Sequence, residues 1–265
     1  MFWWLMKYVL LGPLLRLLYR PKAMGLDNIP DEGPVILAAN HQSFLDDFLL
    51  PLVLKKRKAT ILAKADYFDH WYTRWFFKGA GCVPVRREGG SAGLAALRTA
   101  IDALNEGKLV ALFPEGTRSP DGRLYRGKTG VARIALEAQA PVIPVAIVGT
   151  FELWPYNKKL PKPGTTEIRF GKPLTFERHY ETPADRFVLR SVTDEIMYEI
   201  MMLSGQEYVD EYATKVKDQI DRAKKEGRKP EEAPAAIEQP TVTEQPAVTE
   251  QPATAEASAS QSRDA

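Results

Sequence analysis

The sequence contains few of the side chains that build metal centres or disulfide frameworks. Its 265 residues include one cysteine, Cys82, and three histidines. A single cysteine excludes an internal disulfide framework and a cysteine-ligated zinc site, and it favours a reducing compartment. Three histidines leave little room for a histidine-rich metal centre. These counts predict no metal centre, and we expect no resident cofactor.

Two catalytic sequence patterns are also missing. The chain has no Gly-x-Ser-x-Gly nucleophile elbow and no Gly-x4-Gly-Lys-Ser/Thr phosphate loop. Cys82 lies in an apolar segment, which is more typical of a buried structural thiol than of a nucleophile. These absences argue against a covalent enzyme intermediate and favour direct attack by a group of the substrate.

Uninterrupted apolar runs do not reach the roughly 20 residues that a membrane-spanning helix needs. Residues 2–19 are apolar and aromatic, but a lysine, a Gly-Pro pair and an arginine interrupt them, and no secretory cleavage pattern follows. We expect two short helices that lie in the membrane interface or dip into one leaflet. The basic residues of this stretch would then face anionic lipid: Lys7, Arg16, Arg20 and Lys22. The alternative is a segment packed on the protein's own core.

The charge is unevenly distributed along the chain. Residues 231–265 carry a net charge of −6, which leaves +8 on residues 1–230. From residue 229 onward the chain is rich in proline and repeats Glu-Gln-Pro every six residues, so we predict a disordered tail at 229–265. The moderate basic excess suits anionic lipid or a phosphorylated small molecule. Nucleic acid is disfavoured because no recognised binding motif accompanies the charge.

Short apolar runs alternate with helical spacing in the rest of the chain. Apolar residues at steps of three and four predict helices around 94–104 and 192–203. Runs rich in valine and isoleucine predict six buried strands, at residues 34–39, 60–63, 82–85, 109–113, 142–148 and 167–170.

This alternation predicts an α/β fold with a mostly parallel sheet flanked by helices. We divide the chain into a membrane-associating helical segment at 1–20, an α/β domain at 21–228 and the tail at 229–265. In such sheets, ligands bind outside the carboxyl ends of the strands. The residues directly after each strand are therefore the candidates for function.

The segment after the first predicted strand holds the best catalytic candidate. Residues 40–47 are Asn-His-Gln-Ser-Phe-Leu-Asp-Asp. A carboxylate bonded to one nitrogen of His41 would fix its tautomer and let the other nitrogen accept a proton. Residues five apart on a regular helix lie about 140° apart, so Asp46 or Asp47 can reach His41 only if the histidine precedes the helix. A loop histidine beside a helix cap is the alternative.

The segment after the fourth predicted strand is Phe-Pro-Glu-Gly-Thr-Arg-Ser, at residues 113–119. Arg118 could hold a phosphate through two parallel hydrogen bonds, and Gly116 permits a tight turn. Glu115 is more typical of a turn or a salt bridge than of a general base. A polar loop that ends a strand is the alternative.

Other basic and aromatic residues have two interpretations each. Arg86 and Arg87 follow the third predicted strand and Lys64 follows the second, so they could converge on the same phosphate or remain solvated. The basic run at 55–58 could be solvated, or could hold lipid headgroups or the phosphates of coenzyme A. The aromatic-rich stretch at 67–77 could belong to the core, to a membrane-contact face or to the wall of an acyl groove.

These segments together resemble the glycerolipid acyltransferase family of 1-acylglycerol-3-phosphate acyltransferases. Residues 40–46 and 113–119 resemble the first and third blocks of that family. Gly-Cys-Val-Pro-Val-Arg at 81–86 resembles the second block, and Val-Ile-Pro-Val-Ala-Ile-Val at 142–148 resembles the fourth. Four blocks in the correct order are far more specific than any one of them. The resemblance covers about residues 20–225.

The resemblance implies transfer of an acyl chain from acyl-CoA or acyl carrier protein to the hydroxyl of lysophosphatidic acid, which gives phosphatidic acid. It implies that His41 is the general base and that Asp46 orients it. It assigns the acceptor's phosphate to residues near the strand ends: Arg118, Arg86, Lys64, Glu115 and Gly116. The enzyme would work at the cytoplasmic face of the cell membrane as a peripheral or monotopic protein.

Three alternatives remain open at this point. The family's second block usually carries a more polar residue where this chain has Val85, so glycerol 3-phosphate or another lysophospholipid could be the acceptor. A thioesterase would use water in place of an alcohol. A non-catalytic lipid-binding protein would not need His41.

Overall fold

The computed structural model describes residues 5–226, apart from residues 72–73, 76–77, 79–81, 86–89, 157 and 182. The predicted tail at 229–265 lies outside the described residues, and so do Arg86 and Arg87.

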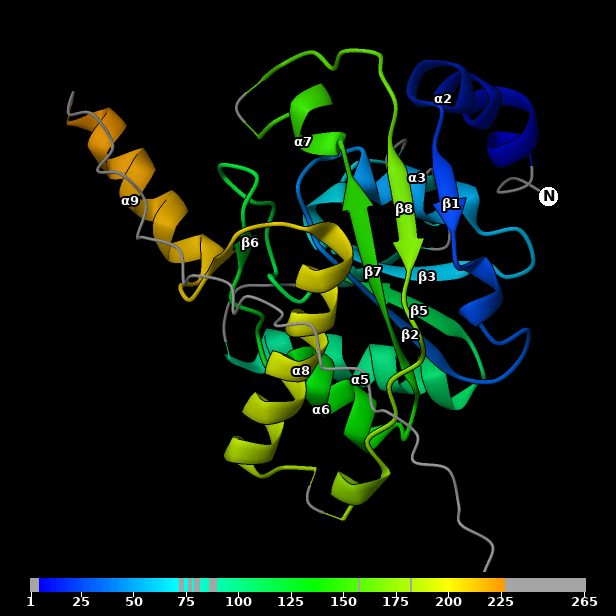
Figure 1. Ribbon diagram of the computed structural model, residues 1–265, viewed down its shortest axis with the longest axis vertical. Helices are drawn as coiled ribbons and strands as arrows, with labels where there is room; N and C mark the ends of the chain where they lie inside the picture. Colours follow the sequence, from blue (N-terminus) through cyan, green and yellow to red (C-terminus); the bar gives the residue numbers. More distant parts are fainter. Residues whose placement is uncertain are drawn as a thin grey trace, which may run out of the picture.

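A seven-stranded sheet in the order β1-β8-β7-β2-β5-β3-β4 forms the centre of the molecule (Figure 1). Its strands are β1 (Lys22–Met24), β2 (Val35–Ala39), β3 (Ala59–Lys64), β4 (Cys82–Val85), β5 (Leu109–Leu112), β7 (Val142–Val148) and β8 (Glu167–Phe170). The five strands from β7 to β4 run parallel, whereas β8 pairs antiparallel with β7. The predicted α/β fold with a mostly parallel sheet is confirmed, and β1 is an additional edge strand.

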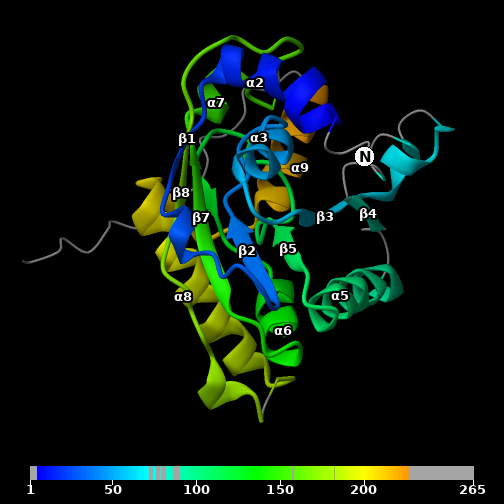
Figure 2. The ribbon, with the colours of Figure 1, turned by 90° about the vertical axis from the view of Figure 1, so that its right-hand side faces the viewer.

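Helices cover both faces of this sheet (Figures 1 and 2). One face packs against α5 (Gly90–Asn105), α6 (Gly130–Glu137) and α8 (Arg186–Ser204). The other face packs against α2 (Leu11–Tyr19) and α3 (Asp46–Val53). The two long helices predicted around 94–104 and 192–203 are α5 and α8.

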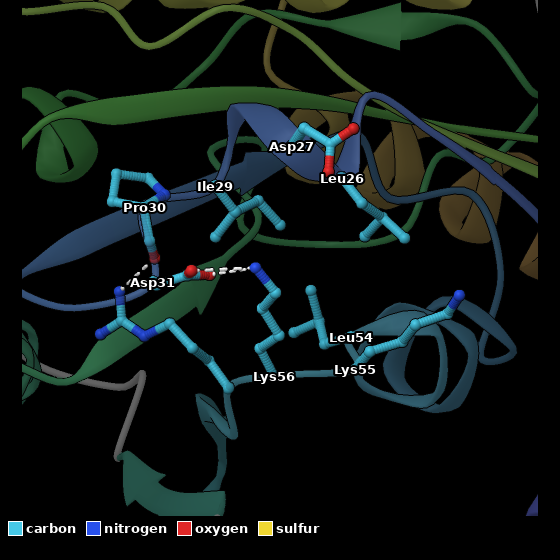
Figure 3. Close-up of a pocket in the computed structure, with 9 residues that line it drawn as sticks. Leu26, Asp27, Ile29, Pro30, Asp31, Leu54, Lys55 and Lys56 are labelled. Atoms are coloured by element: carbon cyan, nitrogen blue, oxygen red, sulfur yellow. Dashed lines mark hydrogen bonds and ion pairs between the residues drawn. The ribbon is translucent and has the colours of Figure 1, made fainter.

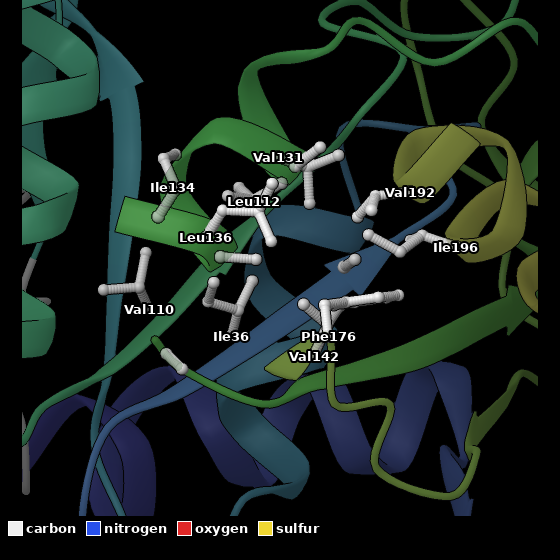
Figure 4. Close-up of a cluster of buried hydrophobic side chains, with 14 of the residues drawn as sticks. Ile36, Val110, Leu112, Val131, Ile134, Leu136, Val142, Phe176, Val192 and Ile196 are labelled. Carbon is white, nitrogen blue, oxygen red and sulfur yellow. The ribbon is translucent and has the colours of Figure 1, made fainter. Parts of the chain in front are cut away.

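The two faces of β2 show why its sequence is apolar without interruption. All five residues of the strand are buried. Ile36 packs among side chains of α6 and α8, including Val131 and Ile196 (Figure 4). Leu37 points to the opposite face and belongs to a second buried cluster with residues of α2 and α3. Burial on both faces is the pattern expected for a central parallel strand.

Smaller elements complete the fold. Other elements among the described residues are η1 (Met6–Leu10), η2 (Leu26–Asn28), η3 (Ala65–Phe68), β6 (Leu124–Tyr125), α7 (Thr150–Leu153), η4 (Glu177–His179), β9 (Tyr208–Val209) and α9 (Ala213–Lys225). The strands β6 and β9 form a separate parallel pair. Helix α9 packs its apolar side on that pair, because Ala213 and Val216 are buried against Tyr125 and Val209.

The N-terminal segment forms a π-helical turn, η1, that leads into α2. A Cβ atom on Gly12 would lie 1.6 Å from the carbonyl oxygen of Lys7, so only glycine fits this junction. Leu15 and Tyr19 are buried against the sheet, whereas Leu14 and Leu17 are exposed, Leu17 by 70%. One side of α2 therefore packs on the protein's own core, whereas contact of its exposed side with the membrane stays a prediction. The part of the chain that the structure describes contains no helix of sufficient length and apolarity to cross a membrane.

The basic residues of this segment correct one prediction. The ammonium of Lys7 donates hydrogen bonds to the carbonyls of Pro51 and Leu54 at the end of α3, and Lys7 is only 6% exposed. Arg16 donates to the carbonyls of Lys7 and Leu52, each at 3.4 Å. Burial and then the charge of Arg16 lower the pKa of Lys7 to about 8. The prediction that Lys7 faces lipid is therefore wrong, because it caps α3 instead.

The aromatic-rich stretch at 67–77 has a divided environment. Phe68 is buried, whereas Trp71 and Trp75 are exposed, Trp71 by 81%. The side chains of residues 67, 72, 76 and 77 lie outside the described set. The two tryptophans place the described part of this stretch mainly on the surface.

Candidate active site

His41 and Asp46 meet directly after β2. The Nδ1 atom of His41 lies 3.0 Å from Oδ2 of Asp46. The same oxygen accepts the backbone N–H groups of Gln42 at 2.7 Å and Ser43 at 2.8 Å. His41 precedes α3 and Asp46 is the first residue of that helix, which is the arrangement that the spacing requires. Because Nδ1 is engaged, Nε2 is the nitrogen left to accept a proton from a substrate.

The loop after β5 supports the histidine from the other side. The ring of His41 stacks on Phe113 with centroids 3.9 Å apart and an interplanar angle of 15°. The backbone N–H of Ser119 donates to the carbonyl oxygen of His41 at 2.7 Å. The two strands β2 and β5 are parallel neighbours, so their following loops leave the sheet at the same edge. The structure thus brings residues 40–46 and 113–119 together.

Glu115 holds these two loops in place. Its Oε1 accepts the N–H of His41 at 2.9 Å, and its Oε2 accepts the N–H of Tyr125 at 3.1 Å. The residue is 1% exposed, and burial raises the pKa of its carboxyl group to about 8 despite the two backbone hydrogen bonds. Gly116 follows with φ +72°, a conformation that favours glycine. Both residues shape the loop, and the carboxyl group of Glu115 is directed to backbone amides rather than to solvent.

Asn40 ties the same loop to the neighbouring strand. Its Oδ1 accepts the N–H of Ile147 at 2.7 Å, and its Nδ2 donates to the carbonyl of Ile147 at 3.0 Å. Its Nδ2 also donates to Oε1 of Gln206 at 2.7 Å, and Gln206 in turn donates to the carbonyl of Gly122. Gln206 was not predicted from the sequence, because nothing in its surroundings marks a side chain that reaches Asn40 from the end of α8.

Arg118 lies at the same edge of the sheet. Its guanidinium carbon is 5.9 Å from the ring centroid of Phe44 and 5.4 Å from that of Tyr156. Lys217 of α9 lies beside it, with Nζ 2.9 Å from Oγ1 of Thr117 and 4.0 Å from the centroid of Tyr156. Burial and then the charge of Arg118 lower the pKa of Lys217 to about 8. Sequence reasoning missed Lys217, which is 99 residues beyond Arg118 and outside all four blocks.

Two predicted phosphate ligands have no described side chain. Arg86 lies outside the described residues altogether. Lys64 is the last residue of β3 and therefore stands at the same edge of the sheet as His41, but only its backbone is described. Their predicted contact with a phosphate remains a prediction.

A cavity of about 480 Å³ lies at the opposite end of the sheet from His41 (Figure 3). Lys56 forms an ion pair with Asp31 there, at 2.8 Å. Arg57 donates to the carbonyls of Pro30, Gly33 and Gly107. Gly33 and Gly107 lie shortly before β2 and β5, so this cavity is at the amino ends of the strands. Lys56 and Arg57 thus bind the protein's own groups. Within the described ranges, no group of three His, Cys, Asp or Glu side chains could hold a metal ion.

Known proteins resemble this part of the chain in sequence and in fold. The sequence model of the Acyltransferase family matches residues 20–148. A chloroplast 1-acyl-sn-glycerol-3-phosphate acyltransferase from Brassica napus is 31% identical over 158 residues, which make up 59% of this chain and 45% of that protein. The 1-acyl-sn-glycerol-3-phosphate acyltransferase of Bacillus subtilis is 30% identical over 154 residues, which make up 58% of this chain and 73% of that protein.

A solved structure agrees with these sequence matches. The crystal structure of the 1-acyl-sn-glycerophosphate acyltransferase from Thermotoga maritima has a TM-score of 0.56 and 29% identity, over 69% of this chain and 71% of that one. The chain spans a little less than half the length of the plant and algal relatives that it matches. The Bacillus subtilis protein is matched over 73% of its length, and the family match at residues 20–148 contains the loops that carry His41 and Arg118. The chain therefore belongs to the acyltransferase family.

Proposed function

We propose that this protein transfers an acyl chain from a thioester to the free hydroxyl of lysophosphatidic acid, which yields phosphatidic acid for phospholipid synthesis. The observation that carries the proposal is the contact between His41 Nδ1 and Asp46 Oδ2 at the carboxyl edge of a parallel sheet. The names of the relatives from Brassica napus and Bacillus subtilis support the same reaction class. The donor is acyl-CoA or acyl carrier protein.

His41 acts as the general base in this proposal. Its Nε2 takes the proton of the acceptor hydroxyl while the hydroxyl oxygen attacks the carbonyl carbon of the thioester. The carbon–sulfur bond then breaks, and the imidazolium returns its proton to the departing thiolate. Asp46 is a positioning residue, since its Oδ2 fixes the tautomer of the ring and stabilises the imidazolium.

The acceptor's phosphate lies at Arg118 in this proposal. A guanidinium presents paired N–H donors that match phosphate oxygens. Ser119, the residue after Arg118, is hydrogen-bonded to His41 through the backbone, so the cation and the base sit on connected loops. Arg86 and Lys64 are further proposed contacts with the same phosphate.

The protein meets the membrane through α2 as a peripheral or monotopic protein, at the cytoplasmic face. Leu14 and Leu17 present an exposed apolar side of this helix, while Leu15 and Tyr19 fix its other side to the domain. Helix α2 and helix α7, which follows β7, lie at the same end of the molecule in both views (Figures 1 and 2). The exposed side of α2 is therefore at the end of the sheet where His41 lies.

The test compares wild type with His41→Ala, both solubilised in detergent and given radiolabelled palmitoyl-CoA. Lysophosphatidic acid, glycerol 3-phosphate and no acceptor are supplied in separate reactions. We expect phosphatidic acid from wild type alone, and only with lysophosphatidic acid. Lysophosphatidic acid made from glycerol 3-phosphate would change the acceptor, and free palmitate without an acceptor would identify a thioesterase. Equal turnover by His41→Ala would overturn the assigned base.

A further inference from the structure

Helix α9 brings a lysine to the candidate phosphate site from outside the region that the family model matches. The matched region ends at residue 148, whereas Lys217 lies near the centre of α9. Its Nζ atom donates to Oγ1 of Thr117 at 2.9 Å, and Thr117 is the neighbour of Arg118. Two regions that are distant in sequence therefore meet at one loop.

The position of α9 is fixed by packing rather than by the lysine alone. Val216, the residue before Lys217, is buried against Tyr125. Tyr125 also donates its N–H to Glu115, the carboxyl group that holds the loop beside His41. A rigid chain of contacts thus runs from the apolar side of α9 to the loop that carries Arg118.

Two cations share one aromatic ring at this place. Lys217 Nζ is 4.0 Å and the Arg118 guanidinium carbon is 5.4 Å from the ring centroid of Tyr156. Among the described residues, neither cation forms an ion pair with a carboxylate. Glu115 and Asp221 raise the pKa of Lys217, but burial and the charge of Arg118 outweigh them and lower it to about 8.

Two like charges held close together in a partly buried place repel each other, and a bound anion offsets this repulsion. A phosphate monoester carries up to two negative charges and accepts several hydrogen bonds, so it satisfies both cations and the hydroxyl of Thr117 at once. A single carboxylate would offer half of that charge. The arrangement therefore matches a phosphate monoester better than a monoanion.

We propose that Lys217 and Arg118 together form a two-cation site for a phosphate monoester, with Lys217 supplied by α9. The proposal rests on the acyl transfer proposed above, for which the sequence indicates Arg118 but not Lys217. Lysophosphatidic acid carries such a group, and so does the 3′-phosphate of coenzyme A. Lys217 contributes to binding and to acceptor choice, and it takes no part in proton transfer.

The test measures the KM of each substrate and kcat for the full chain and three variants. Lys217→Gln removes the charge, Lys217→Arg keeps it, and Lys215→Gln is the matched control, since Lys215 lies on the same helix and pairs with Glu211. We expect Lys217→Gln to raise one KM by about tenfold to a hundredfold, the range for a charged hydrogen-bonding group, with kcat changed less. Lys217→Arg should restore most of that loss, and Lys215→Gln should behave as wild type.

The KM that rises identifies the source of the phosphate. A rise for lysophosphatidic acid assigns the site to the acceptor, and a rise for palmitoyl-CoA assigns it to the donor. Unchanged values of both in Lys217→Gln, or a rise equal to that of Lys215→Gln, would overturn the proposal. Binding of lysophosphatidic acid to His41→Ala and to His41→Ala/Lys217→Gln, by calorimetry, needs no turnover. Weaker binding in the double variant supports the site even if wild type transfers no acyl chain. A lack of acyl transfer would contradict only the proposed reaction.

Discussion

The two ends of the central sheet carry similar residue types in different electrostatic situations. At the amino ends of the strands, Lys56 is paired with Asp31, and Arg57 donates to three backbone carbonyls. At the carboxyl ends, Arg118 and Lys217 lie together on Tyr156, and no described carboxylate pairs with either. A basic cluster in a sequence therefore does not mark a binding site by itself. Arg118 and Lys217 differ from Lys56 in that no described carboxylate neutralises their charge, although Lys217 donates a hydrogen bond to Thr117.

The largest expected effect is on catalysis, and it distinguishes the carboxyl ends of the strands from their amino ends. His41→Ala should lower kcat by about 10²- to 10⁴-fold, or about 3–5 kcal/mol, because general-base help is lost. Lys56→Ala at the opposite end should leave kcat unchanged, since Lys56 pairs with the exposed carboxylate of Asp31. Initial rates with palmitoyl-CoA and lysophosphatidic acid measure both. A comparable loss in Lys56→Ala would contradict the contrast between the two ends.

The next effect is on stability, at the buried carboxyl group of Glu115. In Glu115→Gln the amide oxygen can accept one backbone N–H, but the NH₂ group faces the other, so a buried donor is left unsatisfied. We expect a loss of about 1–3 kcal/mol in the free energy of unfolding. Asp31→Asn, the matched change at the exposed end, should leave the denaturation midpoint close to that of wild type. Equal denaturation midpoints for Glu115→Gln and Asp31→Asn would show that the carboxyl group of Glu115 does not hold the two loops together.

The pH dependence of stability tests the same group independently. Burial raises the pKa of Glu115 from an ordinary 4.5 to about 8, so between these values the folded chain keeps a proton that the unfolded chain has released. Its contribution to stability is therefore complete below about pH 4.5 and is lost as the pH rises through about 8. Urea titrations at several pH values should show this loss in wild type and a flatter profile in Glu115→Gln. An identical slope in both proteins would argue against the raised pKa.

A smaller effect concerns the membrane. Leu14→Glu/Leu17→Glu replaces the exposed apolar side of α2 with charge at the end of the molecule that holds His41. Burying one leucine is worth about 1.5–3 kcal/mol at most, so sedimentation with phospholipid vesicles should show binding weakened by about tenfold or more. Phe187→Glu changes a still more exposed apolar position, at the start of α8, and should bind as wild type. If Phe187→Glu weakens binding as much, α2 is not the contact.

The smallest effect is a pH dependence of acceptor use. The free protein loses the positive charge of Lys217 as the pH rises through about 8, because burial and the charge of Arg118 lower the pKa of this lysine against the opposing influence of Glu115 and Asp221. The kcat/KM for lysophosphatidic acid should fall by about threefold to tenfold across that range, since this ratio reports the free enzyme. Lys217→Arg stays charged and should lack this fall. A parallel fall in both proteins would show that another group is responsible.

The fold was largely predictable because its central strands are apolar and buried on both faces. All six expected strands form, and continuous apolar runs such as 142–148 are typical of a covered parallel sheet, whereas β8 alternates in burial and pairs antiparallel with β7. The contact between His41 and Asp46 was predictable in outline from their spacing and the helix that begins at Asp46. The short pair β6 and β9 was not, because two-residue strands have no periodicity to detect.

The parts that escaped prediction depend on contacts distant in sequence. Lys217 is one of several lysines on a polar helix, and the packing of that helix through Val216 on Tyr125 places it beside Thr117. Lys7 was predicted to face lipid because its neighbours are apolar, yet the unsatisfied carbonyls at the end of α3 attract its ammonium inward. A sequence pattern shows which residues are neighbours along the chain. The roles of Lys7 and Lys217 come from contacts with residues that are distant in sequence.

The cap that Lys7 places on α3 also sets a distance. Lys7 holds the carboxyl end of this eight-residue helix, and Asp46 at its first residue holds His41. At about 1.5 Å per residue the helix is about 12 Å long, so it fixes the distance between His41 and the segment that we propose to contact the membrane. With α2 in contact with a bilayer, as proposed, the length of α3 sets the height of His41 above the acyl chains of the lipids. The enzyme would then select hydroxyl groups by their depth in the headgroup layer as well as by their chemistry.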